Sequence, residues 1–273
     1  MQNQSSITVV KLGGTEGVDF SAICQDVVGL VQQGQPLVLV HGGSSEANQL
    51  GEALGAPPRF ITSPSGFTSR YTDRKTLEIF SMAVNGKVNT LLVEQLQRLG
   101  VNALGLSGLD GKLIQATRKD SIQSIENGKR KIIRDDYTGK IDQVNTDLLQ
   151  LLLTNGYVPV IAPMAVSQTG EALNVDADRA AAMIAAALKA QNLLLLTAVP
   201  GLMRAFPDES TLIHKLPQGQ LETAINYAEG RMKKKVLGAQ EALQGGVGRV
   251  IIADGRSGQP ISAALNGGGT WIE

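Results

Sequence analysis

VVKLGG at residues 9–14 and LVLVHGGS at residues 37–44 are two short apolar runs that each lead into a glycine pair. Uninterrupted apolar runs of this length are typical of buried parallel strands, and a helix-like segment follows each one. Glycine at the end of a strand lets backbone N–H groups approach an anion, because no Cβ stands in the way. Since Lys11 lies in the first stretch, the two turns together predict a site that transfers a phosphoryl group.

The same order of strand, turn and helix continues along the chain. Strands are predicted at 7–11, 37–40, 103–106, 158–162, 193–197 and 250–253, the last of these being the final core strand. Helices are predicted at 19–33, 45–54, 72–99 with a kink near Gly86, 143–154, 177–190, most of 221–244, and 260–265. This alternation predicts an α/β fold, a three-layer αβα sandwich around a mostly parallel open sheet, without a flexible linker that would divide it.

Composition excludes several classes of protein. The 273 residues carry 25 Lys and Arg against 25 Asp and Glu, so the basic excess usual in nucleic-acid-binding proteins is missing. Cys24 is the single cysteine, so no internal disulfide can form, and it is expected to be a core residue of the first helix. Because His41 and His214 are the only histidines, a metal site built from His and Cys is not expected. Residues 1–6 do not resemble a signal peptide, and no apolar run approaches about 20 residues. A cytoplasmic protein that binds neither nucleic acid nor membrane is therefore expected.

Residues 112–140 are unusually basic and contain short apolar runs around Asn127-Gly128. Asn-Gly favours a type I′ turn, so the segment is predicted to be a β-hairpin. Two interpretations of its charge stay open: a solvated basic face without a partner, or a docking surface for something acidic. The cations that would form such a surface are Lys129, Arg130, Lys131 and Arg134.

Phosphoryl transfer requires that charge on the moving group be neutralised. Lys11 supplies one cation, and the run Lys233–Lys235 offers a second, although an exposed charged turn is the alternative for a triple lysine. Asp176 and Asp178 precede the alanine-rich segment 177–190. Either acid could cap that helix, but a carboxylate placed between two ammonium groups also orients both and limits their repulsion.

Other polar residues have structural and functional interpretations. Arg70 is suited to bind a substrate carboxylate through its planar guanidinium, or it forms a surface ion pair with Asp73. His41 is expected to form hydrogen bonds near its turn and not to act as a base. No Ser-His-Asp or Cys-His order typical of nucleophilic catalysis stands out, and no GxxxxGK[ST] loop is present. A carboxylate acceptor needs no base, because it is already ionised at pH 7.

Four motifs occur in a characteristic order: KLGG at 11–14, HGG at 41–43, NVDAD at 174–178 and MKKK at 232–235. In this order they resemble the amino-acid kinase family, within it the acetylglutamate kinase-like proteins. The stretches SRYTDRKTLE at 69–78, GLSGLDG at 105–111 and DYTGK at 136–140 are similar to the branch whose members act on amino acids attached to the carrier protein LysW. The resemblance covers the whole chain.

The resemblance implies a role for individual residues. Lys11 and Lys235 would stabilise the transition state, and Asp178 would organise them. Phosphate would bind at Gly13, Gly14, Gly42, Gly43 and Ser44; the acceptor would bind at Gly42, Gly43, Arg70 and Asn174; and the nucleotide would bind at Thr197, Val199, Gly201, Leu202, Met232 and Lys233. ATP and Mg²⁺ would be the cofactors, with no metal held by protein side chains. Ser44 replaces a glycine and Ala198 an aspartate that acetylglutamate kinases usually have, and the carrier-dependent branch tolerates both.

The implied reaction is ATP-dependent phosphorylation of a side-chain carboxylate to an acyl phosphate, in lysine or arginine biosynthesis. The acceptor would be α-aminoadipate, and also glutamate, attached to LysW, a small acidic protein that the basic hairpin would hold. N-acetylglutamate kinase and an inactive amino-acid or nucleotide sensor are the alternatives. A single amino-acid kinase domain over residues 1–273 is expected, with acceptor binding and dimerisation in about 1–170 and nucleotide binding in about 171–273. Because the N-terminal helix of hexameric acetylglutamate kinases is missing, a homodimer is expected.

Overall fold

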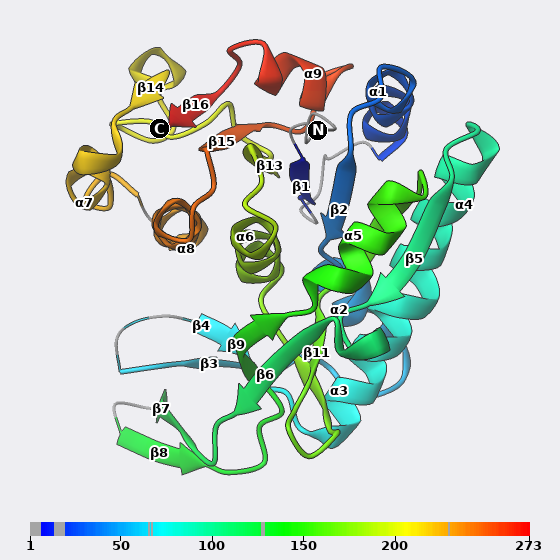
Figure 1. Ribbon diagram of the computed structural model, residues 1–273. Helices are drawn as coiled ribbons and strands as arrows, with labels where there is room; N and C mark the ends of the chain where they lie inside the picture. The colour runs from blue at the N-terminus through cyan, green and yellow to red at the C-terminus, as the bar shows by residue number, and fades with distance from the viewer. Residues whose placement is uncertain (1–6, 14–19, 65, 67, 127–128, 229) are drawn as a thin grey trace.

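The computed structural model describes residues 7–13, 20–64, 66, 68–126, 129–228 and 230–273. Within these residues eight strands form the central sheet (Figure 1), in the order β14 (Lys215–Leu216), β16 (Thr270–Ile272), β15 (Arg249–Asp254), β13 (Asn192–Thr197), β1 (Thr8–Leu12), β2 (Leu37–His41), β10 (Val158–Ala162) and β5 (Ala103–Ser107). Neighbouring strands pair in parallel except β15 and β16, which are antiparallel. The mixed α/β fold with a mostly parallel sheet is thus confirmed.

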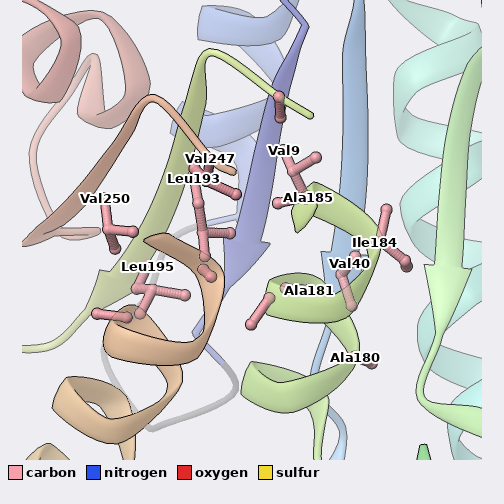
Figure 2. Close-up of a cluster of buried hydrophobic side chains, with 14 of the residues drawn as sticks. Val9, Val40, Ala180, Ala181, Ile184, Ala185, Leu193, Leu195, Val247 and Val250 are labelled. Carbon is pink, nitrogen blue, oxygen red and sulfur yellow. The ribbon is translucent and has the colours of Figure 1, made fainter. Parts of the chain in front are cut away.

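Alternate residues of each central strand enter two different hydrophobic cores, one on each face of the sheet. In β1, Val9 belongs to the core formed with α6 (Ala177–Ala187) and α8 (Gly230–Gln244) and lies beside α6 in Figure 2, while Val10 belongs to the core formed with the opposite helices. These are α1 (Phe20–Gln32), α4 (Thr90–Arg98) and α9 (Pro260–Leu265). The period of two follows from the alternation of side chains along a strand, and it requires apolar residues at every position.

Two of the helices have the core packing expected from the sequence. The small side chains of Ala180, Ala181 and Ala185 let α6 pack closely on the sheet, and all three are fully buried. Cys24 is buried in α1, as predicted.

The long helical pattern at 72–99 is confirmed, and its irregularity lies where the kink was expected. The chain runs through α3 (Arg74–Ser81), a π-helical segment η1 (Met82–Asn89) and α4, with Gly86 inside the π segment. A wider turn of this kind changes the direction of the side chains that follow it. At its end, the Asn89 side chain donates to Val160 O at 2.9 Å and pairs with His41 Nε2 at 3.0 Å, which fixes the helix to the sheet.

Short strands extend the molecule beyond the carboxyl ends of β1 and β2 (Figure 1). The described residues form a four-stranded sheet in the order β12 (Ala172–Asn174), β11 (Met164–Val166), β6 (Ile114–Arg118) and β9 (Gly139–Val144), and the hairpins β3 (Phe60–Thr62) with β4 (Thr68–Arg70) and β7 (Ile122–Glu126) with β8 (Lys129–Ile133). The predicted basic hairpin is therefore confirmed in β7 and β8. Its expected type I′ turn at Asn127-Gly128 lies outside the described residues.

Several predicted boundaries are wrong for local reasons. Residues 143–144 belong to β9, because Asn145 accepts from Leu148 N and starts helix α5 (Thr146–Thr154) there. Helix α6 stops at Ala187, before its predicted end at residue 190. The prediction that most of 221–244 is helical is confirmed, in two helices, α7 (Leu221–Ala224) and α8. Strand 250–253 is not the final core strand, because β16 follows α9.

The remaining helices are α2 (Ser44–Ala53) and the short 3₁₀ turns η2 (Asp110–Lys112), η3 (Glu209–Thr211) and η4 (Gln218–Gln220). Within the described residues, no helix has the length and apolar character needed to cross a membrane.

Candidate functional site

A cavity of about 760 Å³ opens at the carboxyl ends of β1, β2 and β13. This edge is where open α/β sheets bind ligands, because the strand ends and the following helix N-termini direct backbone N–H groups into one space. Its walls come from both halves of the chain. The predicted site residues that line it are Lys11, Gly13, Gly42, Gly43, Ser44, Arg70, Asn174, Asp178, Thr197, Val199, Gly201, Leu202, Met232 and Lys235.

Lys11, Asp178 and Lys235 meet in the centre of this cavity. Lys11 Nζ lies 2.9 Å from Asp178 Oδ1, and Lys235 Nζ donates to Asp178 Oδ2 at 2.7 Å. Both lysines are only 8 % exposed. Because β1 supplies one lysine, α8 the other and the first turn of α6 the aspartate, three distant segments build the arrangement.

The charge of this triad follows from burial and from its mutual contacts. Burial alone would raise the pKa of Asp178, but the ammonium groups of Lys11 and Lys235 outweigh it and hold that pKa well below its usual range. Burial lowers the pKa of Lys235, and the Asp178 carboxylate opposes this shift only in part. Asp178 is therefore an anion at pH 7 that orients two cations, leaving their other protons for a phosphate.

Asp176 has the second role that was open for these two acids. It is the N-cap of α6, and its Oδ1 accepts from Arg179 N at 3.0 Å. The two acids of the NVDAD motif thus have different roles. Asp176 precedes the helix and caps it, while Asp178 projects from its first turn toward the two lysines.

The second glycine turn packs closely against the π-helical segment. A Cβ at Gly43 would stand 2.7 Å from Val84 Cγ1, so the turn has no room for a side chain there. Ser44 is the first residue of α2, a helical position that suits serine without the conformational freedom of glycine. Its N–H is among those at a helix start that lack an intrahelical acceptor. Gly14 lies outside the described residues, while Gly13 lines the cavity.

Arg70 and Asn174 are held in place on the other side of the cavity. Arg70 is buried, and its Nη2 donates to Ser44 O at 3.2 Å and to Asn48 Oδ1 at 2.5 Å. Asn174 Nδ2 donates to Thr72 Oγ1 at 3.1 Å. Asp73 caps α3 by accepting a hydrogen bond from Thr76 N. The structure thus gives Asp73 this role and not the alternative ion pair with Arg70.

The residues expected to contact a nucleotide lie beyond the end of β13. Thr197, Val199, Gly201 and Leu202 line the cavity, and Leu202 N donates to Thr270 Oγ1, which fixes this loop to β16. A Cβ at Gly201 would come within 2.6 Å of the same Oγ1, so glycine is required for this packing. Ala198, where an aspartate was expected from acetylglutamate kinases, is not among the lining residues.

Of the three consecutive lysines, each has a different position. Lys235 belongs to the triad, whereas Lys233, expected to contact the nucleotide, is exposed on α8 and is not among the residues that line the cavity. Lys234 lines it instead, and its Nζ donates to Thr68 O at 2.9 Å. That bond joins the start of α8 to the β3–β4 hairpin across the cavity, a pairing of residues 166 positions apart that no sequence pattern indicates.

Aromatic side chains were missed in the sequence analysis. Phe60, Phe80, Phe206 and Tyr227 line the cavity, and Phe206 is largely exposed at its rim. Aromatic residues make up only 4 % of this chain, so a phenylalanine at position 206, within a polar segment, could have indicated a ligand-binding position in the sequence.

His41 has the structural environment expected for it. The ring is fully buried, with Nδ1 2.6 Å from Gly42 O and Nε2 paired with Asn89. Burial lowers the pKa of His41 to about 4, so the imidazole is neutral at pH 7.

Comparison with known proteins is decisive for the family. The model of the family described as "Amino acid kinase family" matches residues 6–254. The chain belongs to the amino acid kinase family. This amino acid kinase is 58 % identical over 267 residues to a [LysW]-aminoadipate kinase of Deinococcus radiodurans, a match that covers 98 % of this chain and 91 % of that protein. It is 51 % identical to the [LysW]-aminoadipate kinase of Thermus thermophilus, covering 97 % and 99 %.

Solved structures are similar to this amino acid kinase over nearly its whole length. N-acetylglutamate synthase of Neisseria gonorrhoeae, in complex with coenzyme A and N-acetyl-glutamate, has a TM-score of 0.79 at 26 % identity; the match covers 98 % of this chain but 59 % of that one. Carbamate kinase of Giardia lamblia bound to AMP-PNP has a TM-score of 0.67 at 15 % identity, covering 98 % of both chains, and shows a shared fold.

Proposed function

We propose that this protein transfers the γ-phosphoryl group of ATP to the side-chain carboxylate of α-aminoadipate attached to a LysW-type carrier protein, in lysine biosynthesis. The arrangement of Lys11 and Lys235 on the two oxygens of Asp178 is the observation that carries the proposal. Two buried cations fixed by one anion offer charge neutralisation without a nucleophile or a base. The names and identities of the two relatives above support the acceptor.

The cavity has a side for each substrate in this proposal. ATP lies along the loop after β13 and the start of α8, with its γ-phosphate near Lys11 and Lys235. The acceptor carboxylate attacks the γ-phosphorus, an O–P bond forms, and the bond from phosphorus to the β,γ-bridging oxygen breaks. An acyl phosphate and ADP result. The acceptor's other polar groups bind at Arg70 and Asn174, whose positions are fixed by hydrogen bonds.

The lysines act mainly on charge that develops during this transfer. Phosphoryl transfer spreads negative charge over the equatorial oxygens, and preorganised ammonium and N–H donors stabilise it more strongly in a buried cavity than in water. In this proposal the backbone N–H groups of Gly13, Gly43 and Ser44 are such N–H donors. His41 takes no proton, because its neutral ring is engaged by Gly42 O and Asn89.

Mg²⁺ in this proposal arrives with the nucleotide. Both oxygens of Asp178 are occupied by lysines, so this carboxylate does not fit as a metal ligand. In the part of the chain that the structure describes, no three His, Cys, Asp or Glu side chains are grouped to hold a metal ion. Phosphate oxygens and water, which Mg²⁺ commonly keeps as ligands, would coordinate the ion and offset the phosphate charge.

We further propose that acceptor binding and dimerisation belong to about residues 1–170 and nucleotide binding to about 171–273, in a cytoplasmic homodimer. The exposed cations Lys129, Arg130, Lys131 and Arg134 are proposed to attract the acidic carrier, an interaction that salt screens.

Hydroxylamine trapping tests the proposed reaction. Purified protein with ATP, Mg²⁺ and carrier-attached α-aminoadipate should form hydroxamate, and a Lys11→Ala control should lose about 10²–10³ in kcat. Hydroxamate from free N-acetylglutamate but not from the carrier-attached acceptor would make the protein an N-acetylglutamate kinase. Hydroxamate from neither, in a folded protein that binds nucleotide, would favour an inactive sensor. Carrier-attached glutamate belongs in the same assay, because it differs from the aminoadipate acceptor by one methylene, worth about 1–3 kcal/mol.

A further inference from the structure

The outer face of the β7–β8 hairpin carries apolar side chains, although basic residues dominate the sequence of this segment. The strand register pairs Ile125 with Arg130 and Gln123 with Ile132, so these four residues lie on one face. Ile132 is 57 % exposed and Ile125 is 40 % exposed. The opposite face includes Ile133 and Ser124, which are buried. The hairpin therefore rests on one face and presents two isoleucines to solvent on the other.

Cations lie beside these two isoleucines. Arg130 lies on the same face as Ile125 and Ile132, and the exposed Arg134 follows the end of β8. The exposed Lys129 and Lys131 belong to the opposite face by the same register. Single exposed apolar residues are common, but an apolar pair beside cations has the composition of a protein interface. The cations fit an acidic partner, and the isoleucines fit an apolar spot on that partner.

The hairpin is continuous with the wall of the cavity. Strand β7 contacts β3, and the β3–β4 hairpin lines the cavity through Phe60, Thr68 and Arg70. Figure 1 shows the two hairpins side by side, below the ends of β1 and β2. A protein seated on β7 and β8 would thus have a short path along β3 and β4 by which an amino acid attached to it reaches the cavity.

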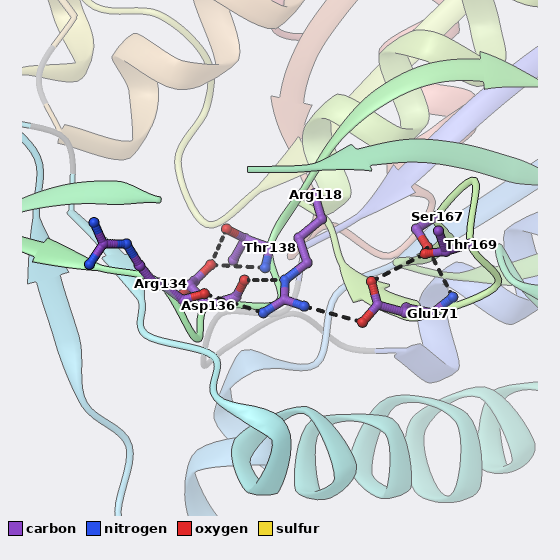
Figure 3. A network of polar contacts seen from close by, with 7 residues as sticks. All are labelled: Arg118, Arg134, Asp136, Thr138, Ser167, Thr169 and Glu171. Atoms are coloured by element: carbon purple, nitrogen blue, oxygen red, sulfur yellow. Dashed lines mark hydrogen bonds and ion pairs between the residues drawn. The ribbon is translucent and has the colours of Figure 1, made fainter. Parts of the chain in front are cut away.

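The chain that follows β8 is fixed between this face and the acceptor side of the site. Arg118 donates to Asp136 O at 2.9 Å and to Arg134 O at 3.4 Å (Figure 3), and its guanidinium lies 3.7 Å from the centre of the Tyr137 ring. The buried Asp136 carboxylate accepts from Thr72 N at 3.0 Å. Since Thr72 also accepts from Asn174, the base of the hairpin and the acceptor site share one hydrogen-bonded network.

We infer that the face formed by Ile125 and Ile132 is the apolar anchor for the acidic carrier, from which the attached amino acid reaches the cavity across β3 and β4. This inference rests on the proposed function. The cations of the hairpin steer the carrier, while the isoleucines provide contact energy that salt does not screen.

Replacing Ile132 by Ser tests the anchor. Covering the exposed half of an isoleucine contributes about 1 kcal/mol to binding. The KM for carrier-attached acceptor should therefore rise about fivefold, both at low salt and at a salt concentration of about 0.5 M. The KM for ATP should be unchanged. The charge-reversed variant Lys129→Glu/Arg130→Glu/Lys131→Glu should raise KM strongly only at low salt. Leu151→Ser on α5, where Leu151 is 60 % exposed, is the matched control and should leave KM unchanged.

Hydrogen exchange on the wild-type protein provides a second measurement that needs no variant. Amides of 122–126 and 129–133 should be protected on addition of the carrier. An Ile132→Ser variant with wild-type KM at both salt concentrations, or unchanged exchange in the hairpin, would overturn the anchor and leave the kinase proposal standing. Failure of the wild type to phosphorylate the carrier-attached acceptor would overturn both.

Discussion

Replacing Asp178 by Asn removes the one negative charge between Lys11 and Lys235 while keeping the shape of the side chain. In the wild type the two ammonium nitrogens lie 2.9 Å and 2.7 Å from its oxygens. In the variant the amide presents one carbonyl oxygen and one NH₂ group. One lysine then keeps an acceptor, and the other faces a donor and a second cation.

The expected magnitude follows from burial and charge. At an effective dielectric constant of about 20, two unit charges about 4 Å apart interact with about 4 kcal/mol. The two ion pairs are therefore a large electrostatic contribution, because both lysines are only 8 % exposed. Only the share that positions the cations for the transition state appears in kcat. Loss of one preorganised donor typically costs about 10²–10³ in rate, and Asp178→Asn should lose about that much.

The pH profile gives a second, independent readout. Burial already lowers the pKa of Lys235, and the Asp178 carboxylate opposes this shift most strongly, with a smaller opposing effect from Asp176. Without the Asp178 carboxylate the pKa falls further, so Lys235 loses its proton at lower pH. The alkaline decline of kcat should therefore begin at lower pH in the variant than in the wild type, a difference that a loss of packing alone would not produce.

Steady-state kinetics with saturating ATP, together with thermal unfolding to verify folding, measures both effects. Asp176→Asn is the matched control, because it is the same chemical change two residues away and Asn caps a helix as well as Asp. It should keep most of the wild-type kcat. Equal kcat in Asp178→Asn and wild type, or equal losses in both variants, would refute the role assigned to the triad.

Two further predictions concern residues beside the triad. Arg70→Lys should raise KM for the acceptor about tenfold and leave KM for ATP unchanged, because lysine lacks the planar fork that now contacts Ser44 O and Asn48; equal increases in both KM values would contradict this. Burial lowers the pKa of His41 to about 4, so between about pH 6.5 and pH 4 this histidine is protonated in the unfolded chain but neutral in the folded chain. The free energy of unfolding should therefore fall by up to about 3 kcal/mol as the pH is lowered through this range. Urea unfolding of His41→Gln should lack that part of the pH dependence, and parallel curves for variant and wild type would disprove it.

Much of the fold was predictable because it rests on local patterns. The five-residue apolar strands β1, β2 and β10 are buried at every position, which is why continuous apolar runs marked them. The π-helical segment around Gly86 was visible as a kink. The three-residue strands β11, β12 and β16 were not predictable, because such short segments form through pairing with partners distant in sequence.

The candidate site shows the same division. The glycine turns and the NVDAD and MKKK motifs indicated which residues to examine, and the family resemblance pointed to Asp178. The residue pattern alone did not distinguish Asp176 from Asp178, because that distinction depends on the start of the helix at Ala177. Likewise Lys233, Lys234 and Lys235 were equivalent in composition. Their different positions depend on the orientation of α8 relative to the cavity, which places Lys235 on Asp178 and Lys234 on Thr68 O.

The sequence by itself determined the alternation of strands and helices, the glycine turns at the strand ends and the set of residues able to neutralise phosphate charge. These properties depend on side-chain type and spacing within a few residues. The family resemblance named Lys235 as the second lysine, but only the tertiary structure showed that Lys11 and Lys235 meet on a shared carboxylate. Only the tertiary structure, likewise, showed that two isoleucines of the basic hairpin lie on one exposed face. Both depend on where distant segments are brought together, since burial and register are set by the packing of the whole chain.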